Sequence, residues 1–168
     1  TGLGLENIIN DFELQDDDYN SIMAKAIADR LAEAFAEKLH QLTRTNYWGY
    51  ASGENISIEN IFKERYDGIR PAPGYPACPD HSEKEILFNL LDAENKIGIK
   101  LTSNFAMDPP ASVCGWYFAH PQSKYFGLGK VLDDQLVDYS NRKNIEIKYL
   151  KKFISPHIKE NYQPEFEI

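Results

Sequence analysis

Arg70 begins a proline-rich segment, RPAPGYPACPDHSEK, that contains four prolines and a glycine within residues 70–84. Proline fixes the backbone and restricts the unfolded chain, so we expect a rigid loop. Because Arg70 precedes a proline, its own backbone is biased towards an extended conformation. A planar guanidinium on a fixed backbone is suited to bind a carboxylate with little ordering cost. The alternative is an intramolecular ion pair, for which Glu64 is a candidate partner.

A second segment braced by prolines, FAMDPPASVCGWYFAHPQSKY, covers residues 105–125 and is rich in aromatic side chains. Alternate residues of a strand point to opposite faces, so some of these rings belong to the core and others do not. An exposed ring near a fixed arginine would suit a ligand that carries both a flat ring system and a carboxylate. Core packing is the alternative for each single ring.

Metal and nucleophile chemistry are weakly indicated. Cys78, Asp80 and His81 are close in sequence, but a structural zinc site needs a second ligand pair at similar spacing, which is absent. A Cys–His nucleophile pair would need a third group to orient it. The segment GLGKV, residues 127–131, lacks the full spacing of a phosphate loop and is better interpreted as a strand. We predict neither a metal site nor a catalytic side chain.

The bulk composition favours one globular unit. The chain has 168 residues, of which 42% are hydrophobic and 26% charged, with a formal net charge of −8. This charge disfavours nucleic acid as a partner. No apolar stretch approaches the roughly 18 residues of a membrane span. Because Cys78 and Cys114 show no disulfide spacing, we expect reduced thiols and a cytoplasmic protein. The opening TGLGLENIIN is neither a signal peptide nor a start, so we expect a segment of a longer protein.

A long helix is the clearest local signal, within residues 16–49. Acidic residues suit its first turn, and Gly49 is a plausible stop. Asp29 and Glu33 lie one turn apart on the side opposite its apolar stripe, so they form either an acidic surface or a face covered by another group. Six apolar residues at helical spacing make up the stripe: Met23, Ile27, Leu31, Phe35, Leu39 and Leu42.

The remaining elements alternate in type. We expect a short helix in residues 57–66 with Ser57 as its cap. A second helix, residues 82–98, has Ser82 and Glu85 as a capping box. Its buried side would consist of four apolar residues: Ile86, Leu87, Leu90 and Leu91.

Three segments rich in β-branched and aromatic residues follow, residues 97–107, 111–120 and 123–132. Their short connections favour antiparallel pairing. Two closing helices are predicted in residues 133–144 and 145–154. The order of elements indicates a single α+β domain covering residues 1–168.

Four motifs resemble the C-terminal activation domain of cobalamin-dependent methionine synthase. The likeness extends over residues 17–156, and RPAPGYPACPDH is its most specific part. The motifs are residues 17–40, 66–84, 105–125 and 131–144. The resemblance implies a curved α+β domain with a twisted antiparallel sheet and flanking helices. It also implies that this chain is the C-terminal portion of that domain, without its upstream part.

The resemblance implies a function in enzyme reactivation. The parent methyltransferase moves a methyl group from methyltetrahydrofolate to homocysteine through cobalamin. Its activation domain binds S-adenosylmethionine, which remethylates oxidised cobalamin while flavodoxin or another reductase supplies an electron. The expected partners are therefore the cobalamin-binding domain of the same polypeptide, which carries the cobalamin, and the reductase. Zinc is expected only in another domain of the parent. The alternative is an interaction module that docks the cobalamin domain or flavodoxin without binding the ligand itself.

The resemblance also assigns binding residues. Arg70 matches the arginine that holds the ligand carboxylate, and Ala72 and Gly74 lie on the loop whose backbone lines the site. Tyr125 matches a tyrosine that contacts the ligand, and Phe126 follows it with an expected main-chain contact.

Three acidic residues complete the expected set. Asp29 and Glu33 match acids on the long helix that face the interior groove of the domain. Glu64 is a weaker candidate for the ligand ammonium.

Overall fold

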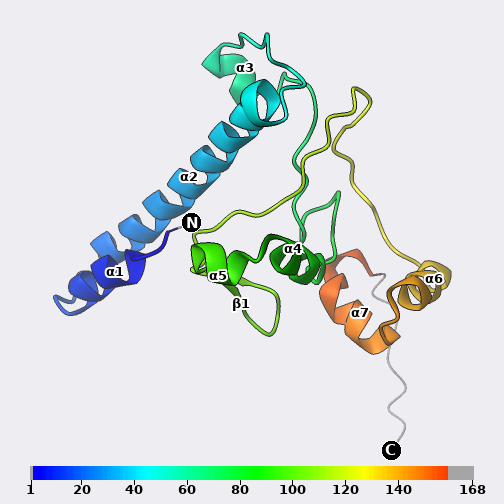
Figure 1. Cartoon of the computed structure of the whole chain (residues 1–168). Coiled ribbons are helices and arrows are strands. Elements are labelled where there is room, and N and C mark those ends of the chain that lie inside the picture. The colour runs from blue at the N-terminus through cyan, green and yellow to red at the C-terminus, as the bar shows by residue number, and fades with distance from the viewer. Residues whose placement is uncertain (1, 159–168) are drawn as a thin grey trace, which may run out of the picture.

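The computed structural model describes residues 2–158 as an α+β chain, which confirms the predicted fold class (Figure 1). The helices are α1 (Leu5–Glu13), α2 (Asp18–Leu42), α3 (Ile58–Phe62), α4 (Glu83–Leu91), α5 (Ala93–Ile97), α6 (Asp133–Lys143) and α7 (Ile147–Phe153). The strands are β1 (Lys100–Leu101) and β2 (Met107–Asp108), and they pair antiparallel. A π-helical turn (Thr43–Tyr47) extends α2, and a 3₁₀ turn (Ser155–His157) follows α7.

The long helix begins and ends where the sequence predicts. The side chain of Asp17 caps α2 by accepting a hydrogen bond from the Asn20 amide at 3.0 Å. At the other end, Gly49 adopts a φ of 75°, a left-handed conformation that glycine tolerates at low cost. Between them, the chain passes from α-helical to π-helical geometry at Thr43. The predicted helix is therefore confirmed.

The strand prediction is only partly correct. Residues 97–107 contribute a short hairpin, in which Leu101 lies opposite Met107. The next two predicted strand segments contain only isolated bridges, which join Ile69 to Phe118 and Val131 to Ile158. Prolines and glycines interrupt both segments, and proline cannot donate to a strand ladder. The bridges nevertheless fix where these segments lie.

The start of α4 differs from the predicted capping box. Ser82 precedes the helix but makes no side-chain cap. Its hydroxyl instead donates to Asp80 at 2.7 Å and accepts from Lys143 at 2.6 Å. Of the four apolar residues predicted to be buried on this helix, only Leu87 is buried. The capping box was therefore wrong because a longer-range polar cluster uses the same hydroxyl.

The C-terminal helices enclose a small apolar core. Leu136 of α6 and Leu150 of α7 are almost completely buried, together with Ile154. Val131, Tyr139, Phe153 and Ile158 pack around them. The two predicted closing helices are confirmed. No helix in residues 2–158 has the length and apolarity needed to cross a bilayer.

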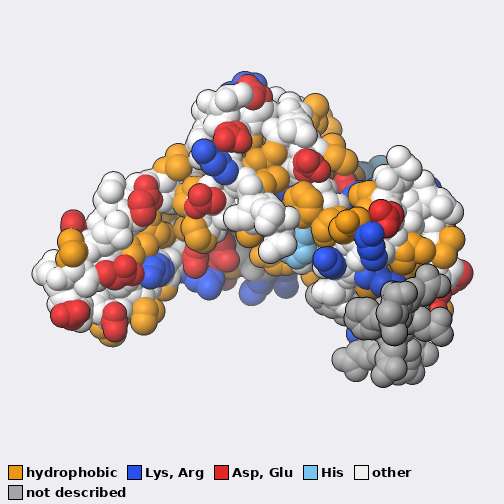
Figure 2. Space-filling view, turned by 90° about the horizontal axis from the view of Figure 1, so that it is seen from below, with side chains coloured by type: hydrophobic (Ala, Val, Ile, Leu, Met, Phe, Trp, Pro, Cys, Tyr) orange, Lys and Arg blue, Asp and Glu red, His pale blue; other side chains and the backbone are white. Residues whose placement is uncertain are grey.

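The arrangement places α1 and α2 away from the C-terminal helices. In Figure 1, α1 lies along the first turns of α2, and α4 to α7 form a separate group joined to the far end of α2 by extended segments. Figure 2 shows apolar and charged side chains mixed on the arm formed by α1 and α2. The extended segments carry Arg70 and Tyr125, so the candidate site lies at the far end of α2.

Candidate functional site

The guanidinium of Arg70 is held by three side chains. Its Nη1 lies 2.6 Å from Glu37 Oε2 and 3.0 Å from the Tyr66 hydroxyl oxygen. The same nitrogen lies 3.4 Å from Nδ1 of His40. Tyr66 in turn donates its hydroxyl proton to Glu37 Oε2 at 3.1 Å. Because these contacts all use Nη1, they orient the guanidinium while leaving Nε and Nη2 for a further carboxylate.

The backbone around Arg70 is also fixed. Its amide donates to the Tyr125 hydroxyl at 3.0 Å, which joins two predicted site residues that are 55 positions apart. One residue later, Pro71 is buried and its carbonyl accepts from the Trp116 amide at 3.0 Å. The proline-rich loop is thereby paired with the aromatic segment.

Gly74 is required by the packing of this loop. Its φ is 99°, which disfavours any residue with a side chain. A Cβ at this position would lie 2.3 Å from Cε1 of His81, so the imidazole already fills that space. The Gly74 amide donates to the Cys78 carbonyl at 2.8 Å and closes the turn.

A second arginine, Arg44, contacts the ring of the same tyrosine whose hydroxyl contacts Arg70. Arg44 is fully buried, and its Nε and Nη2 donate to the two carboxylate oxygens of Glu54 at 2.7 and 2.9 Å. Its guanidinium carbon lies 3.7 Å from the centre of the Tyr66 ring, a cation–π contact. Burial raises the pKa of Tyr66 to about 12. Tyr66 therefore remains a neutral donor between the two arginines.

Glu37 links the two arginines. Its Oε1 lies 4.0 Å from Nη1 of Arg44, and its Oε2 contacts Arg70. Oε1 of Glu37 and Nη1 of Arg44 are buried without a hydrogen-bond partner among the described residues. Buried polar atoms are normally hydrogen-bonded, so these two atoms mark the part of the site that could still form hydrogen bonds.

His40 completes the site as a neutral base. Its ring is fully buried and stacks on Tyr117 at a centroid distance of 4.9 Å. Burial, and then the charges of Arg44 and Arg70, lower the pKa of His40 to about 3. Since Nδ1 accepts from Arg70, we assign the proton to Nε2, which lies 3.4 Å from the Tyr50 hydroxyl.

The depressed pKa of His40 predicts a pH-dependent stability. Unfolded His40 binds a proton near its ordinary pKa of 6.5, whereas the folded chain does so only near 3. The unfolded state therefore binds more protons between these values, and the free energy of unfolding decreases as pH falls from about 6.5 towards 3. One such group contributes a slope of up to about 1.4 kcal/mol per pH unit.

Urea denaturation between pH 7 and pH 5 tests this prediction. We expect wild-type stability to fall over this range and His40→Gln to fall with a shallower slope, because glutamine does not titrate. Equal slopes in the two proteins would contradict the prediction, whatever their absolute stabilities.

The far end of the proline-rich loop is anchored to α6. Asp80 is buried, and its Oδ2 accepts from Lys143 Nζ at 2.5 Å and from the Tyr139 hydroxyl at 2.6 Å. Lys143 Nζ also lies 2.7 Å from Glu83. Burial alone would raise the pKa of Asp80, but the hydrogen bonds from Lys143, Tyr139 and Ser82 outweigh it and lower that pKa. The loop is thus fixed by polar contacts at both ends.

The structure brings together only some of the predicted site residues. Arg70 and Tyr125 are in contact, and Ala72 and Gly74 follow on the same loop. Phe126 lies next to Tyr125 and is exposed. The binding roles of these five residues stay predictions.

The predicted acids lie outside this cluster. Asp29 and Glu33 are exposed on α2, about two turns and one turn before Glu37, and Glu33 pairs with Arg30 at 2.8 Å. Glu64 is exposed and has a positive φ of 51°. The alternative of an ion pair between Arg70 and Glu64 was wrong, because Arg70 pairs with Glu37 instead. The ligand-binding roles of Asp29, Glu33 and Glu64 stay predictions.

Sequence reasoning missed Glu37, His40 and Tyr66. Glu37 continues the spacing of Asp29 and Glu33 by four residues, so a series of acids along one side of the helix was the available signal. No sequence signal indicated which of the three acids would meet the arginine.

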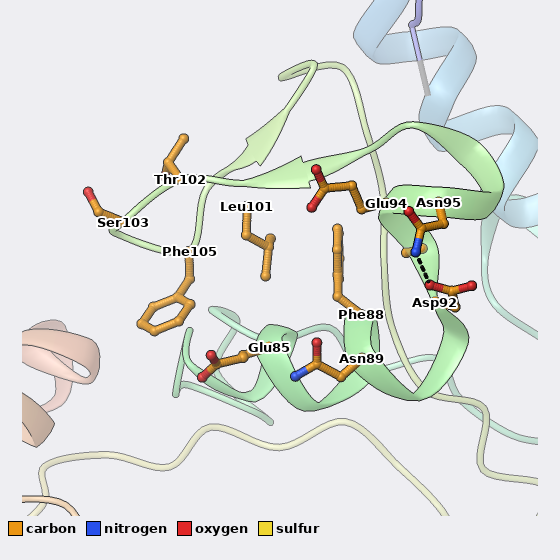
Figure 3. Close-up of a pocket in the computed structure, with 11 residues that line it drawn as sticks. Glu85, Phe88, Asn89, Asp92, Glu94, Asn95, Leu101, Thr102, Ser103 and Phe105 are labelled. Atoms are coloured by element: carbon orange, nitrogen blue, oxygen red, sulfur yellow. Dashed lines mark hydrogen bonds between the residues drawn. The ribbon is translucent and has the colours of Figure 1, made fainter.

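A separate cavity of about 500 Å³ lies between α4, α5 and the β1–β2 hairpin (Figure 3). Phe88, Leu101 and Phe105 contribute its apolar walls, and Asn95 donates to Asp92 at its rim at 2.7 Å. None of the predicted site residues lines this cavity. In the described part of the chain, no three His, Cys, Asp or Glu side chains are grouped to hold a metal ion.

Comparison with known proteins identifies the class. Residues 1–144 match the family model of the vitamin B12 dependent methionine synthase activation domain, so the chain belongs to this family. The chain is also similar to a solved structure described as the MetH reactivation domain bound to AdoHcy, with 51% sequence identity and a TM-score of 0.91. The match covers 96% of this chain and 49% of that one. The chain therefore spans about half the length of the reactivation domain that it matches.

Proposed function

We propose that this chain contributes the S-adenosylmethionine site by which a cobalamin-dependent methionine synthase is reactivated. The observation that carries the proposal is the Arg70 guanidinium, oriented by Glu37 and Tyr66 on a fixed loop. Its two remaining nitrogens are suited to a carboxylate such as the one in an amino acid. A structure 51% identical to this chain is described as bound to AdoHcy, which shares its amino-acid and adenosine groups with S-adenosylmethionine.

The described residues would each take a limited role. Arg70 would bind the ligand carboxylate, the backbone at Ala72 and Gly74 would line the site, and Tyr125 would both hold the Arg70 amide and contact the ligand. Phe126 would contribute a main-chain contact. The negative charge of Glu37 would offset the positive charge of Arg70 while no ligand is bound.

The acidic residues would interact with the positively charged groups of the ligand. Glu64 would bind the ligand ammonium, and Asp29 and Glu33 would face the interior groove of the domain. Carboxylates stabilise ammonium and sulfonium groups electrostatically.

The chemistry would be supplied by the bound groups. S-adenosylmethionine would supply the methyl group and be released as S-adenosylhomocysteine. The acceptor would be cobalamin carried by an adjacent domain of the parent, and flavodoxin or an equivalent reductase would supply the electron. The side chains of this chain would only bind and orient the donor, which agrees with the absence of a predicted nucleophile. Such a module would work in the cytoplasm.

Calorimetric titration of the chain with S-adenosylhomocysteine and S-adenosylmethionine tests the proposal. We expect saturable binding of both, with adenosine alone binding more weakly because it lacks the carboxylate. Methionine serves as the second control, since it carries the carboxylate without the purine. Binding of adenosine equal to that of S-adenosylhomocysteine would contradict the assigned role of Arg70.

The alternative function is an interaction module that docks the cobalamin domain or flavodoxin without ligand binding of its own. It is favoured by the coverage of only 49% of the matched chain, because further ligand contacts would then lie in the other half. No heat with either ligand, together with retained binding to a cobalamin domain, would support this alternative and overturn the proposal for the chain alone.

A further inference from the structure

Four charged side chains form a series of alternating sign that ends at Arg70. In order of contact they are Glu54, Arg44, Glu37 and Arg70. The first two side chains are 4% and 0% exposed, whereas the last two are 20% and 22% exposed. The four formal charges cancel, so a carboxylate that binds Arg70 would leave the series with one excess negative charge.

The contacts within this series are unequal. Arg44 uses Nε and Nη2 for Glu54, at 2.7 and 2.9 Å. Glu37 uses Oε2 for Arg70, at 2.6 Å. The remaining atoms, Nη1 of Arg44 and Oε1 of Glu37, lie 4.0 Å apart, which is too long for a hydrogen bond. Both atoms are buried without a partner among the described residues, and this is destabilising, so they point to a contact that forms in another state.

We propose that Arg44 is a reserve partner for Glu37, towards which the Glu37 carboxylate moves when a second carboxylate binds Arg70. Two carboxylates on one guanidinium repel each other at close range. A displacement of about 1 Å brings Oε1 of Glu37 within hydrogen-bond distance of Arg44 and moves negative charge away from the ligand. Arg44 is then a positioning residue that never touches the ligand. The inference rests on the proposed function only in naming the ligand carboxylate as the second anion.

The surroundings hold Arg44 in place and leave Glu37 free to shift. Arg44 makes two hydrogen bonds to Glu54, and its guanidinium carbon lies 3.7 Å from the centre of the Tyr66 ring. Moving this guanidinium would break both hydrogen bonds. Glu37 is partly exposed, and the terminal torsion of a glutamate side chain is broad, so its carboxylate can rotate and shift without unpacking the core.

Crystal structures of the wild-type chain and of Arg70→Gln test the exchange without any ligand. Glutamine removes the positive charge beside Glu37, as a ligand carboxylate would offset it. Arg70 is partly exposed, so this variant keeps the fold. We expect the distance between Oε1 of Glu37 and Nη1 of Arg44 to shorten from 4.0 Å to about 3 Å. An unchanged distance, or a water that bridges the two atoms in both structures, would overturn the proposal.

Calorimetric titration of Arg44→Lys gives an independent readout. The single nitrogen of lysine can stay paired with Glu54 but cannot also reach Glu37. We expect about a tenfold loss of affinity for S-adenosylhomocysteine and unchanged affinity for adenosine, which lacks the carboxylate. Damage to folding alone would weaken both ligands. The loss should disappear when Glu37→Gln is also present, because a neutral amide does not repel the ligand carboxylate.

Arg142→Lys provides the matched control, because it makes the same substitution in an exposed arginine that pairs with Asp138 through Nε at 2.8 Å. This variant should bind both ligands as the wild type does. Wild-type affinity for S-adenosylhomocysteine in Arg44→Lys, or equal losses for both ligands, would overturn the proposal. If the wild-type chain binds no S-adenosylhomocysteine, the proposed function fails for the chain alone, and the structure of Arg70→Gln still decides whether Glu37 moves to Arg44.

Discussion

Replacing Arg70 with alanine is expected to reduce the affinity for S-adenosylhomocysteine by about 100-fold or more, equivalent to roughly 3 kcal/mol. The variant removes the guanidinium nitrogens that would bind the ligand carboxylate by charge-assisted hydrogen bonds. Calorimetric titration under the conditions used for the wild type would measure the loss. Arg142→Ala is the control, because Arg142 lies exposed on α6 and pairs with Asp138.

A second variant separates binding from folding. Arg70→Ala leaves Glu37 without its nearest cation, so a decrease in stability is expected as well. Arg70→Lys keeps a positive charge beside Glu37 but lacks the planar fork. We therefore expect near-normal stability with affinity that remains low. Wild-type affinity in Arg70→Lys would contradict bidentate recognition by the guanidinium.

The same variant has an expected consequence in an intact parent enzyme. Arg70→Ala should impair reactivation at subsaturating S-adenosylmethionine and leave primary turnover from methylcobalamin largely unchanged. Reactivation equal to that of the wild type would refute the assigned role.

Replacing Lys143 with methionine is expected to lower the free energy of unfolding by about 3–5 kcal/mol. Lys143 is the cation nearest to two carboxylates, the buried Asp80 and the partly buried Glu83. Its removal leaves their charge uncompensated in a desolvated position. Urea denaturation at neutral pH would measure the loss. Lys148→Met is the control, since Lys148 pairs with Glu146 on the surface and should have little effect.

Acid should reduce the difference between the wild type and Lys143→Met. The folded-state pKa of Asp80 is lowered, so its contribution is present above its unfolded pKa of about 3.9 and is lost as pH falls through the folded value. In the variant, protonation of Asp80 relieves the uncompensated charge. A difference that grows below pH 4 would contradict this explanation.

Helices were predictable from the sequence because their signals are local. Asp17 caps the start of α2, and Gly49 follows the π-helical turn that extends this helix. Leu136 and Leu150 mark the buried sides of α6 and α7. The absence of regular strands between residues 111 and 132 was not predicted. The aromatic residues there indicated strands, but prolines and glycines limit the pairing to single bridges. The capping role predicted for Ser82 was wrong for a non-local reason: its hydroxyl accepts a hydrogen bond from Lys143, which lies 61 positions away in the sequence.

The candidate site divides in the same way. Arg70 and its loop were recognisable, because proline spacing and family motifs are both sequence properties. The Arg70–Glu37 pair was not, since it depends on where the loop crosses α2. Burial of the apolar stripe was not predictable either: its helical spacing indicates a packed face, whereas Leu31 and Phe35 are 65% and 60% exposed.

The anchoring of the proline-rich loop would affect how the proposed site discriminates between ligands. Tyr125 fixes its beginning, His81 fills the space beside Gly74, and Asp80 fastens its end to α6. A binding surface whose conformation is fixed by folding cannot readily change to fit a ligand of a different shape. Selectivity between sulfur-containing nucleosides would then depend on how well each ligand fits the shape of the fixed loop. An analogue with a bulkier amino-acid group would bind more weakly, because the loop would not rearrange to make room for it.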